Sequence, residues 1–305
     1  MNKDIRTILA NVIDDKRIKI NEPMKNHTSF RVGGAADFFL EPENEEEAAA
    51  IVRLLLMEDI PFYILGNGSN LLVSDDGYRG VILSISKGMS ETDVNGNEIK
   101  AGAGCLLSVI ASLALKNELT GFEFAAGIPG SVGGAMVMNA GAYGGEMKDI
   151  VKEVTVLDME SGKIINISGS DMEFGYRTSI IKKKPYLVLS AIFVLQKGEH
   201  SAISARMNEL AAMRRAKQPL EYPSAGSTFK RPEGYFAGKL IEDSGLRGFQ
   251  IGGAQVSEKH CGFIINKDNA SAGELMRLIK KVEDKVFTDS GVRLETEVCL
   301  LGDFD

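Results

Sequence analysis

The chain has 305 residues, of which 44% are hydrophobic and 25% charged, so it can form two or three domains around a substantial core. Its formal net charge of −7 argues against nucleic acid or an anionic membrane as the main partner, because both select basic surfaces. No apolar run is long enough to span a membrane, and residues 1–15 carry acidic side chains unlike those of a secretory signal. We therefore expect a cytoplasmic protein without membrane insertion.

The first part of the chain, residues 1–88, has β-α-β character. Residues 3–17 have helical spacing, and a second helix is expected to open on the acidic residues 41–43 and to stop near Pro61. Strands are expected at the apolar runs 36–40, 62–65 and 80–85.

The second part, residues 89–198, favours short antiparallel strands. A strand at 98–103 and a helix at 106–116 lead into a glycine-rich stretch. Strands at 151–158 and 163–167 flank the turn residues 160–162, and a longer strand covers 186–195.

The third part, residues 199–291, mixes helices and strands. Helices are expected at 201–217, at 236–243 and after the capping box Ser271–Glu274; strands are expected at 248–256 and 261–266. A last strand is expected at 292–301. The C-terminal segment 292–305 that contains it is expected to pack with the first domain, residues 1–88. The sequence thus predicts an α+β protein of three domains, 1–88, 89–198 and 199–291.

Two glycine-rich stretches, residues 65–70 and 121–146, suggest a bound anion. The second contains eight glycines, and glycine lets a ligand approach the backbone N–H groups closely. The alternative is a series of tight turns in a core of small residues. Leu71 replaces the third glycine of the dinucleotide fingerprint, and no GK[ST] follows either loop. FAD, held at its diphosphate by backbone amides, requires neither fingerprint.

Cysteine and histidine do not indicate metal chemistry. Cys105, Cys261 and Cys299 are far apart and lack CxxC spacing, so we expect reduced, buried thiols. His260 precedes Cys261, but no third ligand lies at a useful spacing, so we expect no metal site.

Eight motifs, spread over nearly the whole chain and in the same order, resemble the UDP-N-acetylenolpyruvoylglucosamine reductase family. They are HTSFRVGG (27–34), LGNGSN (65–70), AGIPGSVGGA (126–135), MNAGAYGGE (138–146), FGYRTS (174–179), SAGSTFKRP (224–232), AGKLIEDSGLRG (237–248) and LETEV (294–298). Only fifty positions separate Arg177 from Ser227, without a long tyrosine-bearing insertion, which resembles the shorter, type II branch.

The resemblance implies a fold of the vanillyl-alcohol-oxidase type with two FAD-binding subdomains and a C-terminal substrate domain. It implies non-covalent FAD, NADPH as hydride donor, and reduction of UDP-N-acetylglucosamine enolpyruvate in peptidoglycan precursor synthesis. It places the cofactor contacts in the two glycine-rich loops: Leu65, Gly66, Asn67, Gly68, Ser69, Asn70, Gly127, Ile128, Pro129, Gly130, Ser131, Gly133, Gly134, Asn139, Ala140 and Gly141.

By the same resemblance Arg177, Ser227 and Glu297 are catalytic. Arg177 offers a planar cation to the substrate carboxylate, Ser227 delivers a proton to the α-carbon, and Glu297, if held protonated, shares the developing charge. Tyr176 and Lys230 are expected to contact the substrate or its diphosphate. Cys299 stands where a basic residue is common in the family, so charge support for Glu297 is in doubt.

Two other functions remain open at this point. A flavin oxidase of the same fold would reduce oxygen in place of an enol ether. A non-catalytic nucleotide-sugar sensor would bind the UDP-sugar but no flavin.

Overall fold

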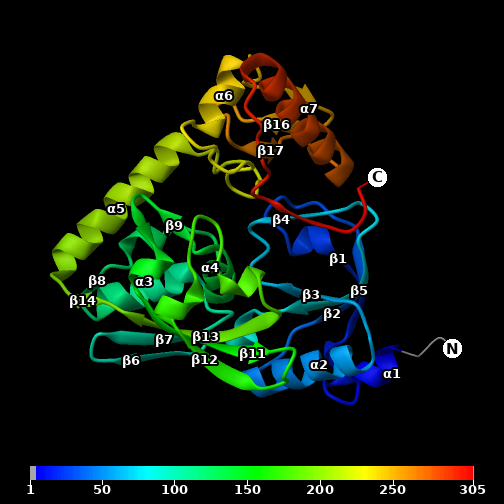
Figure 1. The fold of residues 1–305 in the computed structure, drawn as a ribbon, viewed down its shortest axis with the longest axis vertical. Coiled ribbons are helices and arrows are strands. Elements are labelled where there is room, and N and C mark those ends of the chain that lie inside the picture. The colour runs from blue at the N-terminus through cyan, green and yellow to red at the C-terminus, as the bar shows by residue number, and fades with distance from the viewer. Residues whose placement is uncertain (1–4, 305) are drawn as a thin grey trace. The chain divides into compact units, whose positions relative to one another are not determined.

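The computed structural model describes residues 5–304, apart from the side chain of Lys87 (Figure 1). These residues form two compact units. Unit 1 comprises the described residues up to Ile20, together with Phe38–Asn67 and Gly80–Met213. Unit 2 comprises Asn21–Asp37, Gly68–Arg79 and the described residues from Arg214 onward. Helices and mainly antiparallel sheets occur in the same chain, in agreement with the expected α+β class, whereas the three domain boundaries stay a prediction.

The helices and strands alternate along the chain. The α-helices are α1 (Ile5–Leu9), α2 (Glu45–Met57), α3 (Leu107–Lys116), α4 (Val132–Met138), α5 (His200–Lys217), α6 (Ala237–Asp243) and α7 (Ala272–Ser290). The strands of the first half are β1 (Lys19–Pro23), β2 (Ala35–Leu40), β3 (Phe62–Leu65), β4 (Leu71–Val73), β5 (Tyr78–Ser84), β6 (Thr92–Asn95), β7 (Glu98–Gly102), β8 (Leu119–Thr120), β9 (Gly141–Ala142) and β10 (Gly145–Glu146). Those of the second half are β11 (Val151–Asp158), β12 (Ile164–Ser168), β13 (Tyr186–Val194), β14 (Gln196–Lys197), β15 (Gln250–Ile251), β16 (Ala254–Val256), β17 (Ile264–Asn266) and β18 (Cys299–Leu301). The larger sheets have the orders β1-β2-β5-β3, β12-β11-β13-β7-β6 and β15-β16-β17.

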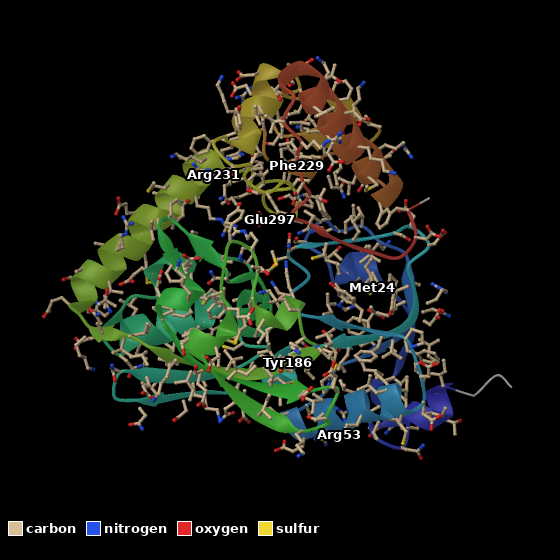
Figure 2. All side chains as sticks on the ribbon, in the orientation of Figure 1. Met24, Arg53, Tyr186, Phe229, Arg231 and Glu297 are labelled. Atoms are coloured by element: carbon tan, nitrogen blue, oxygen red, sulfur yellow. The ribbon has the colours of Figure 1, made fainter. Side chains whose placement is uncertain are left out.

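Unit 1 contains the antiparallel sheet β12-β11-β13-β7-β6. The hairpin between β11 and β12 turns at Gly162, whose φ of +71° suits glycine, and the carbonyl of this glycine accepts hydrogen bonds from Arg53 of α2 (Figure 2). Helix α3 buries Leu107, Ile110, Ala111 and Ala114, spaced at three and four residues, in the same core as the strands. This core fixes the glycine-rich stretch that follows α3.

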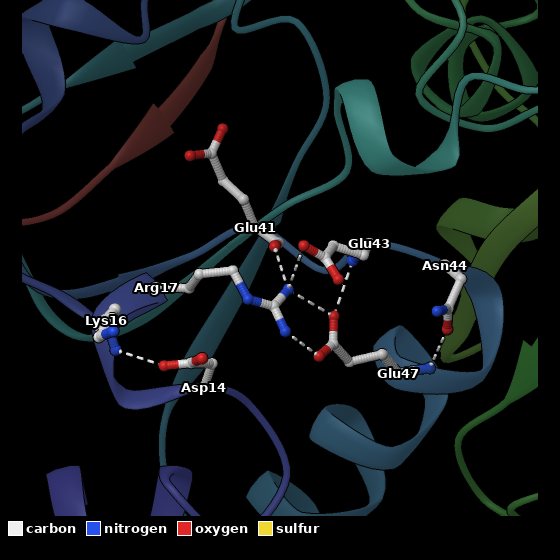
Figure 3. A network of polar contacts seen from close by, with 7 residues as sticks. All are labelled: Asp14, Lys16, Arg17, Glu41, Glu43, Asn44 and Glu47. Atoms are coloured by element: carbon white, nitrogen blue, oxygen red, sulfur yellow. Dashed lines mark hydrogen bonds and ion pairs between the residues drawn. The ribbon is translucent and has the colours of Figure 1, made fainter.

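Helix α2 of unit 1 begins after Asn44, whose side chain accepts a hydrogen bond from the N–H of Glu47 (Figure 3). The carboxylate of Glu47 also accepts hydrogen bonds from Nη1 of Arg17 at 2.9 Å and from the backbone N–H of Glu43 at 2.7 Å. Burial acts to raise the pKa of Glu47, but the hydrogen bonds from Arg17 and Glu43 outweigh it, so the pKa lies below its ordinary value of 4.5. This network holds the segment before α2 against the start of the helix.

We expect Glu47→Gln to lower the free energy of unfolding by about 1–2 kcal/mol at pH 7, since charge-assisted hydrogen bonds are lost. Because the folded-state pKa is depressed, this stabilisation is complete above the unfolded-state pKa and disappears as the pH falls through the folded-state value. Urea unfolding at pH 7 and at pH 3 measures the difference. Glu46→Gln, an exposed position of the same helical turn, is the matched control. An equal loss at both pH values would contradict the assignment.

Unit 2 is built on helix α7, which packs on β15, β16 and β17. Its predicted capping box is confirmed: the Ser271 side chain accepts from the N–H of Glu274, and Glu274 accepts from the N–H of Ser271. Asp75 accepts hydrogen bonds at 2.9 Å from the N–H groups of Ala272 and Gly273. These bonds tie the segment after β4 to the start of the helix.

The C-terminal strand β18 pairs in parallel with β4, Cys299 opposite Leu71 and Leu301 opposite Val73. Strand β4 begins at the residue after the GNGSN loop, so the last strand of the chain supports the segment that leaves this loop. Among the residues that the structure describes, no helix has both the length and the apolar character that a membrane crossing needs.

Several predicted boundaries were wrong. The helix expected at 3–17 ends at Leu9 within the described residues, and α2 begins at Glu45, because Asn44 and not the segment 41–43 is its cap. The strand expected at 248–256 is a hairpin, since Gly252 adopts a φ of +54° between β15 and β16. The strand expected at 292–301 is confined to Cys299–Leu301 with one bridge at Thr296.

Two further differences concern burial and a missing strand. Cys105 and Cys261 are buried as expected, but Cys299 is partly exposed, because it lies on a two-stranded ribbon at the end of the chain. Strand β4 was not predicted, since three apolar residues after a loop give no periodic pattern.

Candidate functional site

In unit 1 the two glycine-rich stretches meet directly. The side-chain amide of Asn67 donates a hydrogen bond to the carbonyl of Pro129 at 2.9 Å. A Cβ atom added to Gly66 would lie 2.8 Å from Oγ of Ser131, closer than real Cβ contacts. The absence of a side chain at Gly66 therefore lets the two loops pack this closely.

Ser131 carries an orphaned hydroxyl at this junction. It stands at the N-cap of α4 and is 2% exposed, yet within the described part of the chain its hydroxyl has no hydrogen-bond partner and does not cap the helix. The first two N–H groups of α4, those of Val132 and Gly133, donate to the carbonyls of Cys105 and Ala103. A buried hydroxyl without a partner costs free energy unless a ligand supplies one. The site thus fits a polar group such as a phosphate.

The second half of the GNGSN loop belongs to unit 2. A Cβ atom on Gly68, whose φ is +61°, would lie 1.9 Å from the carbonyl oxygen of His27, so only glycine fits. The carbonyl of Gly68 accepts a hydrogen bond from the N–H of Ser29 at 3.1 Å. The hydroxyl of Ser29 is also buried without a hydrogen-bond partner among residues 5–304.

Ser29 was not among the predicted site residues. The only signal that could have selected it was its place in the HTSFRVGG motif, between the buried residues Thr28 and Phe30. We add it to the candidate cofactor contacts, because its orphaned hydroxyl lies in a residue bonded to the GNGSN loop.

At some of the glycines predicted to contact the cofactor, close packing within the protein already explains why glycine is present. A Cβ atom on Gly133 would lie 3.3 Å from Cβ of Ala103, and one on Gly141 would lie 2.8 Å from the carbonyl oxygen of Gly145. These glycines permit the close packing of α4 and of the β9–β10 hairpin, whether or not a cofactor also touches them. The remaining residues of this loop, Ile128 and Gly130 among them, form tight turns through the bonds Ile128 N–H to Ala125 and Gly130 N–H to Ile128.

Asn70 and Asn139 have side chains that bind protein groups. The side-chain amide of Asn70 donates to the main-chain carbonyl of Glu297 at 3.0 Å, and the main-chain carbonyl of Asn70 accepts from the N–H of Cys299 at 3.0 Å. The amide of Asn139 donates to Glu146 at 2.6 Å and to the carbonyl of Gly175 at 3.1 Å, while its oxygen accepts from the N–H of Lys148. Both side chains thus hold protein groups in place, and the cofactor contacts of Asn70 and Asn139 remain a prediction.

Arg177 of unit 1 lies in a four-residue turn closed by an antiparallel bridge between Gly175 and Thr178. Its φ of +55° is in the left-handed region, which is unfavourable for an arginine and is common at functional sites. The guanidinium lies 5.4 Å from the ring centroid of Tyr176, which is 56% exposed. The structure thus places the predicted pair Tyr176 and Arg177 at the tip of one turn.

Ser227 and Glu297 belong to unit 2 and lie on two segments that the structure joins. Phe229 and Thr296 form an antiparallel bridge, and Figure 2 labels Phe229 and Glu297 of the two segments. The N–H of Glu297 donates to the carbonyl of Thr228 at 2.8 Å, and that of Lys230 donates to the carbonyl of Glu295 at 2.8 Å. Thr228 is fully buried, and its hydroxyl accepts from the N–H of Ile264 at 3.0 Å. The backbones of Ser227 and Glu297 are therefore fixed by the same pairing.

The structure also distinguishes the two glutamates of the LETEV motif. The carboxylate of Glu295, 73% exposed, is paired with Nζ of Lys230 at 3.0 Å. Glu297 is partly buried, and its carbonyl is held by Asn70. Lys230 was predicted to contact the substrate, and its ion pair with Glu295 would have to open for that contact.

No group of three potential metal ligands occurs within residues 5–304.

Two family models match the chain. Residues 36–168 match an FAD binding domain, and residues 218–301 match the C-terminal domain of UDP-N-acetylenolpyruvoylglucosamine reductase. The first match covers the two glycine-rich stretches, and the second covers Ser227 and Glu297. The FAD predicted from the glycine-rich loops is confirmed at the level of the domain.

The chain also matches whole proteins over nearly its full length. It is 52% identical over 99% of both chains to the UDP-N-acetylenolpyruvoylglucosamine reductase of Clostridioides difficile, and 52% identical to that of Clostridium novyi over 98% of this chain and 97% of the relative. The crystal structure of the reductase from Thermus caldophilus superposes with a TM-score of 0.82 at 32% identity, covering 94% of this chain and 99% of the other. A Phl p 4 variant that is a glucose oxidase, 15% identical with a TM-score of 0.52 over 65% of this chain, shares the fold alone. The expected vanillyl-alcohol-oxidase type of fold is confirmed.

Proposed function

Because the chain belongs to the UDP-N-acetylenolpyruvoylglucosamine reductase family and is an FAD-dependent oxidoreductase, we propose that it reduces UDP-N-acetylglucosamine enolpyruvate to UDP-N-acetylmuramate with NADPH. The proposal places this step in peptidoglycan precursor synthesis in the cytoplasm. The observation that carries it is that Ser227 and Glu297, which match the family's motifs, are fixed on two directly paired segments.

The cofactor is held non-covalently in this proposal. The residues that would hold it are those of the two glycine-rich loops, and the observation that supports them is the junction of Gly66 and Ser131 within unit 1. The orphaned hydroxyl of Ser131 can donate a hydrogen bond to a diphosphate. When bound, FAD supplies the two-electron chemistry that passes a hydride from NADPH to the enolpyruvyl group.

Arg177 is proposed to bind the carboxylate of the enolpyruvyl group. Hydride addition to the terminal carbon of the C=C bond places negative charge on the α-carbon and the carboxylate. A guanidinium carries a permanent charge and two parallel donors, so its bonds to this carboxylate strengthen as charge develops. The neighbouring Tyr176 and, in unit 2, Lys230 are proposed to bind the substrate or its diphosphate.

Ser227 is proposed to donate its hydroxyl proton to the α-carbon, which completes the conversion of the enol ether to a lactyl ether. A serine hydroxyl is a weak acid in water, but a carbanionic carbon is a much stronger base, so the position of the hydroxyl decides the rate. Glu297 is proposed to act in its protonated form and to donate a hydrogen bond to the carboxylate as negative charge develops there, and Asn70 and Thr228 fix its backbone for that role.

Reduction and reoxidation of the flavin under nitrogen test this function. Addition of NADPH is expected to remove the flavin absorbance of the purified protein, and UDP-N-acetylglucosamine enolpyruvate is expected to restore it with formation of UDP-N-acetylmuramate. Reoxidation by oxygen with peroxide release, but not by the enolpyruvyl sugar, would instead identify an oxidase. A colourless protein that binds UDP-sugars would identify a sensor.

A further inference from the structure

The turn that carries Arg177 is attached to the end of the glycine-rich helix α4. Helix α4 ends at Asn139, which adopts the left-handed conformation, with φ of +43°, and is 1% exposed. Asparagine tolerates this conformation better than most residues, so it can end the helix and still present an amide. Its amide reaches the carbonyl of Gly175, the first residue of the turn, at 3.1 Å.

The other side of the turn is fixed in the same way. The fully buried Ser179 donates its hydroxyl to the carbonyl of Val137, also near the end of α4, at 3.1 Å. The ammonium of Lys182 donates to the carbonyl of Arg177 itself at 2.9 Å. Three side-chain bonds therefore hold a turn of four residues, two of them to the end of one helix.

Asn139 is in turn held by its own partners. Its amide donates to Glu146 at 2.6 Å, and its oxygen accepts from the N–H of Lys148 at 3.0 Å. Glu146 is also bonded through its N–H to Asp149 at 3.0 Å. A buried side chain whose donors and acceptor are all engaged has one orientation, so it can transmit a fixed position to the residue that it contacts.

We infer that Asn139 is a positioning residue for Arg177: through its bond to Gly175 it holds the strained turn so that the guanidinium meets the substrate carboxylate. This inference rests on the proposed role of Arg177. It also gives the glycine-rich stretch a second purpose, because the segment predicted to hold the flavin sets the position of the arginine as well.

The test compares two ligands that differ by the lactyl group, which bears the carboxylate. UDP-N-acetylmuramate carries this group and UDP-N-acetylglucosamine does not. The ratio of their dissociation constants, measured calorimetrically on the flavin-loaded protein, reports recognition of the lactyl group, and the part of the ratio that Arg177→Ala removes reports recognition of its carboxylate. We expect the wild type to prefer the carboxylate-bearing ligand by about tenfold, and Arg177→Ala to abolish the preference.

Asn139→Gly retains the left-handed backbone but loses the amide, and we expect it to lower the preference at least about threefold. In Asn139→Gly/Arg177→Ala the preference should equal that of Arg177→Ala alone, because one side chain acts through the other. Asn269→Gly, at another left-handed asparagine with φ of +52°, is the matched control and should leave the ratio unchanged. A purely structural role would weaken the binding of both ligands equally.

Asn139→Asp/Glu146→Gln covers the case in which the glycine variant does not fold. It restores a hydrogen bond between positions 139 and 146 with donor and acceptor exchanged, but it places a carboxylate against the carbonyl of Gly175. It should fold and still lose the preference. An unchanged ratio in either folded variant, beside a lost ratio in Arg177→Ala, would overturn the positioning role. An absent preference in the wild type, or one that survives Arg177→Ala, would instead overturn the proposed role of Arg177 and the inference with it.

Discussion

Ser227→Ala should leave NADPH able to remove the flavin absorbance, while reoxidation by UDP-N-acetylglucosamine enolpyruvate slows by about 10²- to 10⁴-fold. The hydride-accepting half of the reaction does not use the hydroxyl, whereas protonation of the α-carbon depends on it in our proposal. Stopped-flow absorbance under nitrogen separates the two half-reactions.

Ser224→Ala is the matched control, because Ser224 lies in the same SAGS segment, three residues before Ser227, and is also partly exposed. It should reoxidise at the wild-type rate. If Ser227→Ala reoxidises as fast as Ser224→Ala, another group supplies the proton and the assignment of Ser227 is wrong.

Arg177→Gly and Arg177→Ala should lose turnover equally, by about 10²- to 10³-fold in kcat/KM, yet differ in stability. Both variants lose the cation that is proposed to bind the carboxylate. With a φ of +55°, the backbone is strained for alanine but not for glycine, so we expect the glycine variant to be more stable by about 1 kcal/mol. Urea unfolding and steady-state kinetics on the same preparations give both quantities.

Glu118→Gly is the control for the backbone change, because Glu118 is an exposed residue after α3 with a φ of +56°. It should be no less stable than the wild type and fully active. Equal stability of the two Arg177 variants would show that the turn relaxes in solution and stores no strain. Retained turnover in both would remove Arg177 from the proposed mechanism.

The sequence predicted best those elements whose local signals agree with one another. Helix α7 has a capping box at Ser271 and Glu274, an apolar stripe and a terminal Gly291 in the left-handed conformation, and its predicted start is confirmed. Strands β11, β12 and β13 alternate or are continuously apolar over five residues or more, so their period was clear.

Some short elements could not be predicted, because they depend on tertiary contacts. The three residues of β4 are defined by their pairing with β18, from the other end of the chain. The single strand expected at 248–256 contains apolar residues on both sides of Gly252, and only the left-handed backbone of that glycine separates β15 from β16.

For the site, motifs identified the residues but not how they are held. A resemblance in sequence could select Asn70 and Asn139 as part of loops, but it could not show that their side chains bind the carbonyls of Glu297 and Gly175. The sequence could not predict the orphaned hydroxyl of Ser29 either, since burial without a hydrogen-bond partner is a property of the folded chain.

Unit 2 is assembled from segments that lie far apart in the chain, and this has a consequence during protein synthesis. Its early segments, Asn21–Asp37 and Gly68–Arg79, are synthesised long before Glu297, the partner of Asn70, and Cys299, the partner of Leu71. More than two hundred residues are therefore synthesised after the GNGSN loop before the strand that supports it. The pairing that supports this proposed cofactor loop can therefore form only after residues 299–301 have been synthesised.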